Sequence, residues 1–174
     1  MLLELFLDGN KVALETGRFP DGAVRVRLLP PRLPRAEKLK IRATAMRNMD
    51  DLMLLAQVMD AARSQYDLHW TTLELPWLPY ARQDRSMQEG DSFALKIFAG
   101  FLNQLGFDRI RVLDPHSDVA GAVVNNMVAI PQHLCLRHSA NLMEKLQSGM
   151  MLMAPDAGAL KKIHAVAQQV AARE

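Results

Sequence analysis

The chain has 174 residues, of which 49% are hydrophobic and 23% charged, values typical of an ordinary globular domain or of one domain with part of a second. Its formal net charge is only +2, from 21 basic and 19 acidic side chains, which argues against a general nucleic-acid or membrane surface. The single cysteine, Cys135, excludes an internal disulfide and a cysteine-based zinc cluster, as suits a reducing cytoplasm.

The first predicted elements are strands. The apolar run MLLELFLD is interrupted by Glu4 and has neither a basic leader nor a small-residue cleavage site, so a strand is expected there rather than a signal peptide. No segment of the chain approaches the roughly 20 apolar residues of a membrane span. In AVRVRLL, Val24, Val26 and Leu28 alternate with charged residues, as in a half-buried strand. KLKIRATA is a third strand candidate.

A basic cluster surrounds this third strand. The proline-rich segment PPRLPR precedes it, and the cluster also contains Lys38, Lys40, Arg42 and Arg47. Such a cluster is either a solvated connector or an anion-binding patch, and the pattern leaves both interpretations open.

Helices and strands alternate through the rest of the chain. A helix is predicted from Asn48, a good N-cap followed by two aspartates, and a strand follows in HWTTLELPWLP. A second helix is expected over 92–105, with Gly106 as its stop. Its expected apolar face consists of Ile97, Phe98, Phe101, Leu102 and Leu105.

Three further apolar segments, RIRVLD (109–114), NNMVAI (125–130) and MMLMA (150–154), are predicted to be buried strands. Segments 132–147 and 159–172 are predicted to be helices. Strands that alternate with helices favour an α/β fold with three layers and a mostly parallel sheet.

Polar turns follow three of the predicted strands, with the sequences ARQDR, DPHSD and PDAG. Ligands of open α/β sheets bind at the carboxyl ends of the strands, so these turns are candidates for one shared site. Arg82 and Arg85 offer forked donors suited to phosphate. His116 offers an imidazole and Asp156 a carboxylate, and Mg²⁺ binds carboxylates together with water and substrate phosphates.

Each turn also has a plainer interpretation. Arg82 to Arg85 could form an exposed ion-pair turn, His116 could be an ordinary surface histidine, and Asp156 could cap the following helix. The joint occurrence of the three turns favours a phosphate-and-metal site. The glycine spacing fits neither a Walker A loop nor a dinucleotide-binding loop.

Four motifs, GRFPDGAVRV, PYARQDR, LDPHSD and APDAGALKK, occur in an order and spacing that resemble the ribose-phosphate diphosphokinases, or phosphoribosyl-diphosphate synthetases. The resemblance spans roughly Gly17 to Lys162. The variants DPHSDV and DAGALKK resemble a divergent subgroup found in phages and beside nicotinamide-salvage genes. The resemblance implies a type I phosphoribosyltransferase-like fold, a homodimer or higher homo-oligomer, a cytoplasmic location, and no nucleic-acid or membrane partner.

The resemblance further implies transfer of the diphosphoryl group of Mg²⁺-ATP to ribose 5-phosphate, which makes phosphoribosyl diphosphate for nucleotide and NAD biosynthesis. By motif, Phe19 and Asp21 would contact adenine from a neighbouring subunit. His116 and Asp156 would lie at Mg²⁺.

The PYARQDR motif carries the remaining assignments. Arg82 and Gln83 would hold the phosphates of ATP. Asp84 and Arg85 would brace that turn and, with Arg82, form the catalytic group.

Three departures from the family pattern stand out. Ala23 replaces the usual glutamate, and SMQEGD (86–91) lacks the basic residues that many members carry in this loop. The ribose-phosphate loop, two adjacent acids followed by glycine and threonine, does not occur in the chain. We therefore expect residues 1–148 to be an ATP-binding and oligomerisation domain and residues 149–174 the first strand and helix of a second domain. The chain alone is expected to be inactive; the alternative function is a non-catalytic binding or assembly subunit.

Overall fold

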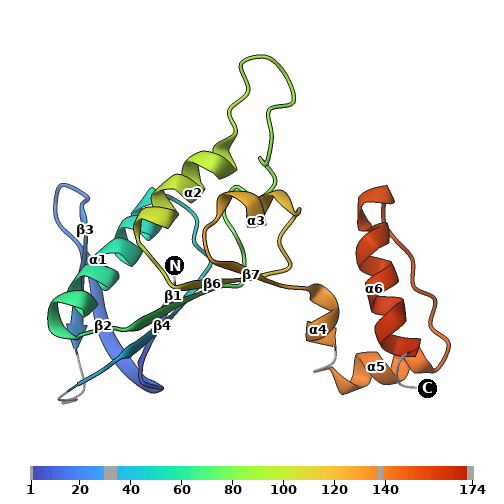
Figure 1. Ribbon diagram of the computed structural model, residues 1–174, viewed down its shortest axis with the longest axis horizontal. Helices are drawn as coiled ribbons and strands as arrows, with labels where there is room; N and C mark the ends of the chain where they lie inside the picture. The colour runs from blue at the N-terminus through green and yellow to red at the C-terminus, as the bar shows by residue number, and fades with distance from the viewer. Residues whose placement is uncertain (1, 30–34, 137–138, 172–174) are drawn as a thin grey trace. The chain divides into compact units, whose positions relative to one another are not determined.

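A computed structural model of the chain describes residues 2–29, 35–136 and 139–171 (Figure 1). Most of the predicted PPRLPR segment, 30–34, lies outside the described residues. The chain forms two compact units, Met1–Ala129 and Ile130–Glu174, and each is described by itself. The elements in chain order are β1 (Leu2–Leu7), β2 (Asn10–Arg18), β3 (Val24–Leu29), β4 (Lys38–Thr44), α1 (Met49–Gln65), β5 (Trp70–Leu75), α2 (Ala94–Gln104), β6 (Arg109–Leu113), α3 (Val119–Val123), β7 (Met127–Ile130), α4 (Gln132–Leu136), α5 (Ala140–Gln147), η1 (Ala157–Ala159) and α6 (Leu160–Ala171).

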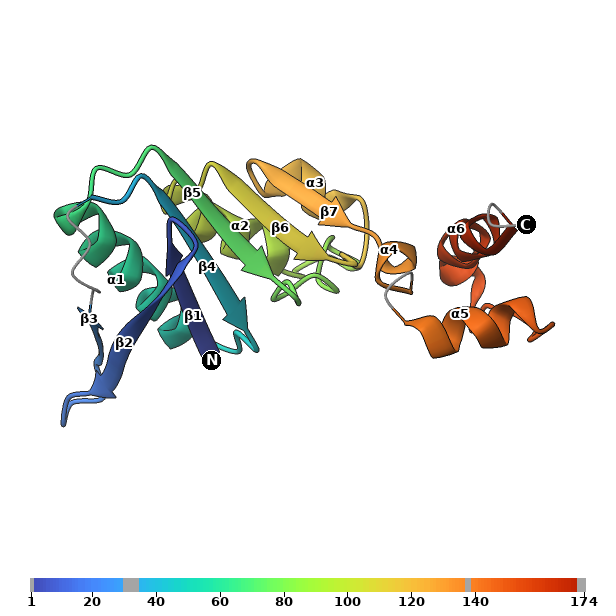
Figure 2. The same ribbon diagram turned by 90° about the horizontal axis from the view of Figure 1, so that it is seen from below.

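The N-terminal unit is built on a seven-stranded sheet with the order β3-β2-β1-β4-β5-β6-β7 (Figure 2). The predicted α/β class is confirmed, but the sheet is mixed rather than mostly parallel. Pairs β1–β2, β2–β3 and β1–β4 are antiparallel, whereas β4–β5 and β5–β6 are parallel. The link between β1 and β2 is only Asp8 and Gly9, both with positive φ, and so short a turn joins only antiparallel strands.

Helices α1, α2 and α3 all cover one face of this sheet (Figures 1 and 2). The strand residues beneath them are apolar and fully buried, as Ile41, Leu73 and Val112 show with exposures of 0%. Leu55 of α1 and Leu102 of α2 are equally buried in the same cluster. Within the described part of this unit the sheet and these helices form two layers, and a third layer stays a prediction.

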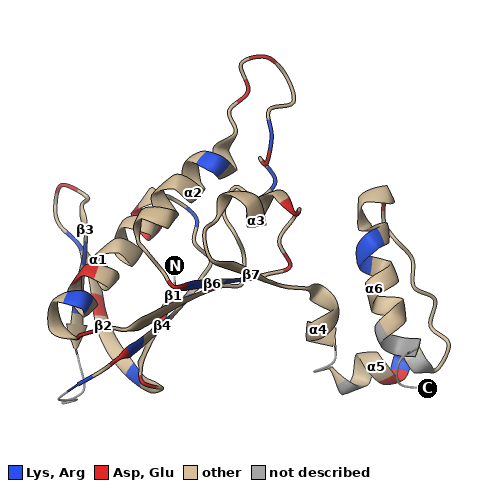
Figure 3. Ribbon diagram, viewed as in Figure 1, with Lys and Arg blue, Asp and Glu red and all other residues tan. Residues whose placement is uncertain are grey.

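The opposite face of the sheet carries many charged side chains, and no helix among the described residues of this unit covers it. A ladder of ion pairs crosses the strands: Lys11–Glu4 at 2.7 Å, Glu4–Arg42 at 3.3 Å, Arg42–Glu74 at 3.1 Å and Glu74–Arg111 at 2.9 Å. Blue and red segments accordingly follow one another on the strands in Figure 3. Burying such charges under apolar helices would carry a large desolvation cost.

The two long helices follow their sequence signals with one exception. The side chain of Asn48 accepts a hydrogen bond from the Asp51 amide and caps α1, as predicted. Gly106, at φ +64°, ends the second helical segment, again as predicted. Ile97 and Phe101 of α2 were expected to be buried, but they are 57% and 47% exposed because the sheet takes up only the neighbouring stripe of Leu95, Phe98, Ala99 and Leu102.

The C-terminal unit contains α4, α5, η1 and α6, with a small core of Met143, Leu146 and Val166. The predicted helix over 132–147 is divided into α4 and α5, and the predicted helix over 159–172 is confirmed as α6. The predicted buried strand MMLMA is wrong: Met151 and Met153 are 86% and 80% exposed, and no strand pairs with them. The units divide at 129/130, whereas the predicted domain division at 148/149 stays a prediction.

Among the described residues, no helix combines the length and apolar character needed to cross a membrane.

Truncating a buried side chain of β5 should test whether the core lies on only one face of the sheet. Leu73→Ala removes a side chain that is 0% exposed, and we expect the free energy of unfolding to fall by about 2–5 kcal/mol because a cavity remains. Thr72→Ala, on the polar face of the same strand, should change it by about 1 kcal/mol or less. Urea denaturation of both variants provides the measurement, and equal losses would contradict the assignment of the faces.

Candidate functional site

Polar loops follow three neighbouring parallel strands at one edge of the sheet. The loop after β4 (45–48) contains Arg47. The loop after β5 (76–93) contains Arg82, and the loop after β6 (114–118) contains His116. Adjacent parallel strands end at the same edge, so these loops are neighbours. The structure thus brings two of the three predicted turns together. The third, 155–158, belongs to the C-terminal unit.

Each of these loops contains a residue in the left-handed backbone region. Ala45 has φ +56°, Tyr80 has φ +59° and Asp114 has φ +43°. Such conformations cost roughly 1–3 kcal/mol in residues other than glycine, and they cluster at functional sites where the surrounding structure holds them. Backbone strain therefore marks the carboxyl edge of β4, β5 and β6 as a candidate site.

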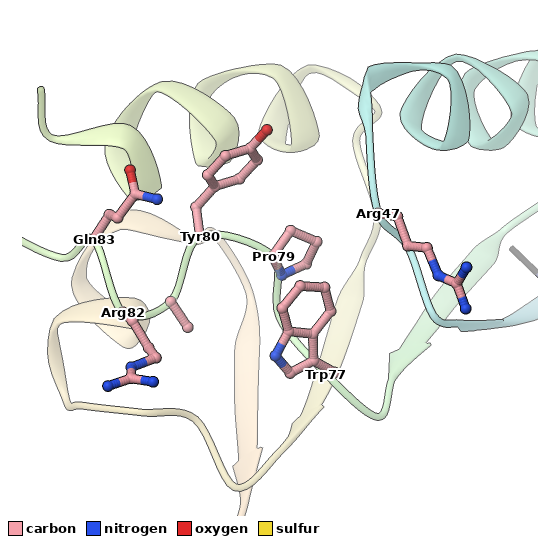
Figure 4. Close-up of a pocket in the computed structure, with 7 residues that line it drawn as sticks. Arg47, Trp77, Pro79, Tyr80, Arg82 and Gln83 are labelled. Carbon is pink, nitrogen blue, oxygen red and sulfur yellow. The ribbon is translucent and has the colours of Figure 1, made fainter.

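Arg82 and Gln83 are exposed on a turn that the backbone fixes at both ends. The Gln83 amide donates to the Tyr80 carbonyl at 2.9 Å, and the Gln83 carbonyl accepts from the Leu95 amide at 3.1 Å, near the start of α2. Both side chains line a cavity of about 300 Å³ together with Arg47, Trp77, Pro79, Tyr80 and Ala81 (Figure 4). The turn thus supplies two residues with N–H donors, Arg82 and Gln83, to the lining of this cavity, and N–H donors of this kind bind anions.

Asp84 is the buried anchor beneath this turn. Its side chain is 5% exposed, and its carboxylate accepts two hydrogen bonds from Arg85, from Nε at 2.8 Å and from Nη2 at 3.1 Å. The Ser117 hydroxyl donates to the same carboxylate at 2.5 Å. The bonds from Arg85 and Ser117 hold the pKa of Asp84 well below its usual range, and the nearby His116 acts in the same direction. This carboxylate therefore joins the loop after β5 to the loop after β6.

Ser117 was missed in the sequence analysis, although it directly follows His116 in DPHSD. A small hydroxyl residue in a polar turn gives no signal of its own, because its partner Asp84 is 33 residues away in the chain. Asp84 and Arg85 form an ion pair within this turn, and their predicted role in bracing it stays a prediction. Their place in a catalytic group stays a prediction.

The predicted metal ligands lie in different units. His116 is exposed in the loop after β6, while Asp156 precedes η1 and its carboxylate accepts a hydrogen bond from the Ala159 amide at 2.9 Å. The capping interpretation of Asp156 thus holds in this structure, and a joint site with His116 stays a prediction. Among the described residues, no three His, Cys, Asp or Glu side chains are grouped so as to hold a metal by themselves.

The predicted adenine contacts, Phe19 and Asp21, lie in the turn between β2 and β3. The Asp21 carboxylate accepts from the Ala23 amide at 2.9 Å, and Phe19 is 54% exposed, with the Arg25 guanidinium 6.0 Å from its ring centroid. Strand β3 is at one edge of the sheet, and β1, β2 and β4 separate it from β5. The structure does not bring these two residues to Arg82 within the chain, so their role toward a neighbouring subunit stays a prediction.

The loop between β5 and α2 differs in charge between its base and its tip. Its base carries Arg82, Asp84 and Arg85, whereas the tip is red in Figure 3 and carries Glu89 and Asp91. The Asp91 carboxylate accepts hydrogen bonds from the amides of Met87 and Gln88 at 3.1 and 2.9 Å. The tip is thus an aspartate-stabilised turn, and 86–91 contributes no cation to the site.

Sequence comparison finds several relatives of one kind. The chain is 26% identical over 161 residues to the ribose-phosphate pyrophosphokinase of Saccharolobus solfataricus, which covers 91% of this chain and 53% of that protein. It is 28% identical over 167 residues to the ribose-phosphate pyrophosphokinase of Pyrococcus abyssi, an alignment that covers 95% of this chain and 55% of that protein. It is 29% identical over 157 residues to that of Shewanella oneidensis, which covers 87% of this chain and 48% of that protein. No family model matches the chain.

The chain is a distant relative of the ribose-phosphate pyrophosphokinases. It spans about half the length of the curated relatives that it matches. The crystal structure of phosphoribosylpyrophosphate synthetase from Mycobacterium smegmatis superposes with a TM-score of 0.75 at 22% identity, covering 94% of this chain and 54% of that one. This likeness confirms the predicted phosphoribosyltransferase-like α/β fold.

The Asp84 anchor should make stability depend on pH. The pKa of Asp84 is lower in the folded protein than in the unfolded chain, where it is about 3.9. Its contribution to the free energy of unfolding is therefore complete above about pH 3.9 and is lost as the pH falls toward the folded pKa. We expect Asp84→Asn to lower the free energy of unfolding at pH 7 by about 1–3 kcal/mol, because Arg85 and Ser117 lose a charged acceptor.

Urea denaturation of wild type and Asp84→Asn between pH 3 and pH 7 provides the measurement. The difference in unfolding free energy between the two should narrow below about pH 4, because Asp84 then binds a proton in the unfolded wild-type chain while it stays ionised in the folded one. Asp91→Asn, in the exposed loop tip, is the matched control. If the difference in unfolding free energy between wild type and Asp84→Asn instead grows as the pH falls, the assigned role of Asp84 is contradicted.

Proposed function

We propose that this chain is the ATP-binding part of a ribose-phosphate diphosphokinase, which transfers the diphosphoryl group of ATP to ribose 5-phosphate. The observation that carries the proposal is the turn of Arg82 and Gln83, which is linked to the His116 loop by the hydrogen bond between Asp84 and Ser117. Distant homology to ribose-phosphate pyrophosphokinases supports it. These relatives are about twice as long, so the activity, substrates and partners all belong to the proposal.

In the proposed reaction, the C1 hydroxyl oxygen of ribose 5-phosphate attacks the β-phosphorus of ATP. A new bond forms between the C1 oxygen and the β-phosphorus as the bond from the β-phosphorus to the bridging oxygen of the α-phosphate breaks, so that AMP leaves with that oxygen and the hydroxyl proton passes to water. Such transfer depends on positioning and charge neutralisation more than on covalent help. Arg82 would place two N–H donors on phosphate oxygens and Gln83 would add a neutral donor, while Asp84 and Arg85 keep the turn in place.

Mg²⁺, when bound with ATP, would neutralise part of the phosphate charge. The His116 imidazole and the Asp156 carboxylate would hold it, and both are exposed in the structure. The Asp156 carboxylate is of the type that Mg²⁺ prefers, the His116 imidazole is a less usual ligand for it, and water and substrate phosphates would supply the remaining ligands. Their common use at one site is part of the proposal.

We further propose a cytoplasmic homodimer or larger homo-oligomer in which Phe19 and Asp21 complete the nucleotide site of a neighbouring subunit. The exposure of the Phe19 ring supports an intermolecular role, since an aromatic ring of this size is a common interface anchor. The affiliation with the phage and nicotinamide-salvage subgroup also stays a proposal.

A non-catalytic binding subunit is the second candidate function. The absence of basic residues from 86–91, and Ala23 in place of the usual glutamate, favour it. Both candidates share the ATP-binding turn and differ in catalysis. Activity of the longest native chain separates them: formation of phosphoribosyl diphosphate that is lost in Asp156→Ala supports the enzyme, and ATP binding without turnover supports the subunit.

Mg²⁺-ATP should bind to this chain through Arg82. We expect Arg82→Ala to weaken binding by about 1.5–3 kcal/mol, the range for a charge-assisted hydrogen bond. Arg27→Ala, an exposed arginine on β3, is the matched control and should leave binding unchanged. Isothermal titration calorimetry with and without Mg²⁺ measures both, and His116→Ala should reduce the metal dependence. An Arg82→Ala protein that binds like wild type would refute the assigned role.

Self-association should depend on the β2–β3 turn. We expect light scattering of the wild-type chain to show a dimer or larger species, and Phe19→Ala to shift it toward monomer because an exposed aromatic anchor is lost. Met49→Ala, which truncates another exposed apolar residue, is the control. A wild-type chain that stays monomeric at high concentration would speak against the proposed assembly.

A further inference from the structure

The face of the sheet opposite the helices carries basic side chains that the candidate site does not use. Figure 2 looks onto this open face, with the strands in front of α1 and α2. Lys38 and Lys40 of β4 and Arg109 of β6 lie on it, because they alternate with the buried residues of the same strands. They stand near the amino ends of these strands, whereas Arg82 and His116 follow the carboxyl ends of β5 and β6.

Two aromatic rings lie beside these cations on the same face. Phe6 of β1 is paired with Lys40 in the sheet register, and Trp70 of β5 is paired with Lys38. The Lys40 ammonium is 4.6 Å from the centroid of the Phe6 ring. The Arg109 guanidinium is 5.3 Å from the ring centroid of Trp70, which is 40% exposed. These five residues form a continuous patch across the neighbouring strands β1, β4, β5 and β6, the basic strip.

The three cations of the basic strip are not paired with carboxylates. In the described part of the chain no ion pair involves them, whereas Arg42 and Arg111 in the next row of the sheet both bind Glu74. The carboxylates of Asp8 and Asp108, beside the strip, accept hydrogen bonds from backbone amides at 2.9 and 2.7 Å. The strip therefore keeps a positive charge at the surface, although the net charge of the whole chain is only +2.

The combination of cations with aromatic rings narrows the kind of ligand. Cations alone attract any polyanion, an acidic peptide included. Aromatic rings among the cations add a surface on which unpaired bases stack, and this combination binds single-stranded nucleic acids. A double helix would offer its phosphates but keep its bases stacked inside, out of reach of a flat sheet face. The strip crosses three gaps between strands, roughly 14 Å in all, and four-stranded sheets of this width stack two or three bases.

We propose that the basic strip binds single-stranded nucleic acid without preference for base sequence. Phe6 and Trp70 stack on bases, and Lys38, Lys40 and Arg109 contact the phosphates. This surface is independent of the proposed ATP site, because the two lie at opposite ends of the same strands. The basic cluster of the sequence, open between a solvated connector and an anion-binding patch, thus contributes two of its lysines to an anion-binding surface.

Tryptophan fluorescence reports on the strip directly, because the chain has only two tryptophans and Trp77→Phe leaves Trp70 as the single fluorophore. We expect oligothymidylate and oligouridylate of about ten nucleotides to quench Trp70 in this variant. The tighter of the two identifies DNA or RNA as the preferred form. Polyglutamate of equal charge should bind more weakly and without quenching. Polyglutamate that binds as tightly as the oligonucleotides would indicate an acidic-peptide surface and overturn the proposal.

The salt dependence of binding counts the phosphates that the strip contacts. Three contacts to a single strand predict a slope of about −2 for log K against log salt. Arg109→Ala should weaken binding and reduce the steepness of this slope by about 0.7. Lys96→Ala, which removes the same charge from the exposed side of α2, is the matched control and should leave the slope unchanged. Equal effects of the two variants would overturn the assignment of the phosphates to the strip.

Substitutions of Trp70 test the stacking contact separately from the charge. We expect Trp70→Ala to weaken oligonucleotide binding roughly tenfold without changing the salt slope, within the range for one stacked base. Trp70→Phe retains an aromatic ring and should recover most of this affinity. Full affinity in a folded Trp70→Ala protein would overturn the stacking role. Should that variant fail to fold, Arg109→Ala still decides, because its side chain is exposed on the surface.

Competition with ATP separates the strip from the candidate ATP site. Oligothymidylate should bind equally well to wild type, to Arg82→Ala and in the presence of saturating Mg²⁺-ATP. Oligonucleotide binding that Arg82→Ala abolishes would place the ligand at the loop after β5 and overturn the strip. A folded wild-type chain that binds no oligonucleotide at low salt would also overturn it, and would leave the proposed function intact.

Discussion

The buried carboxylate of Asp84 is the interaction on which the candidate site depends. A charge at 5% exposure must be paired, and here both partners come from polar loops, Arg85 beside it and Ser117 after the next strand. Each bond satisfies the carboxylate and at the same time fixes one loop to the other. Arg82 and His116 therefore lie on loops that are joined at the same edge of the sheet.

The sheet places this anchor where it can act. In β4, β5 and β6, apolar residues alternate with charged or polar ones, so one face packs on the helices and the other faces solvent. The strands then end together, and the loop after each contains a residue whose backbone is left-handed. Turns this tight direct Arg47, Arg82 and His116 away from the core within a few residues. The free-energy cost of these left-handed residues is offset by the burial of the apolar strand residues that precede them, as in many ligand sites.

Local sequence patterns predicted the elements well where one signal dominated. Asn48 and Gly106 marked helix ends because capping and left-handed backbone are properties of single residues. The mixed sheet was not predicted, since pairing is a non-local property, although the two-residue link at Asp8 and Gly9 required an antiparallel neighbour. MMLMA has the composition of a buried strand, but no strand in the described part of the chain pairs with it, and composition alone does not supply a partner. Motif resemblance found Arg82 and His116, and the basic cluster included Arg47, whereas Ser117 gains significance only from its spatial neighbour Asp84.

The ladder from Lys11 through Glu4, Arg42 and Glu74 to Arg111 also limits what can be built onto this unit. Its charges satisfy one another while water still reaches them, as the 43% and 44% exposures of the Arg42 and Arg111 side chains show. An apolar layer laid over them would strip that water away and gain little in return. Any further domain or second copy that packs there must bring its own polar groups or retain a film of solvent. Apolar surfaces of other polypeptide are therefore expected to pack on the edges or the helices of this unit rather than on the charged face of the sheet.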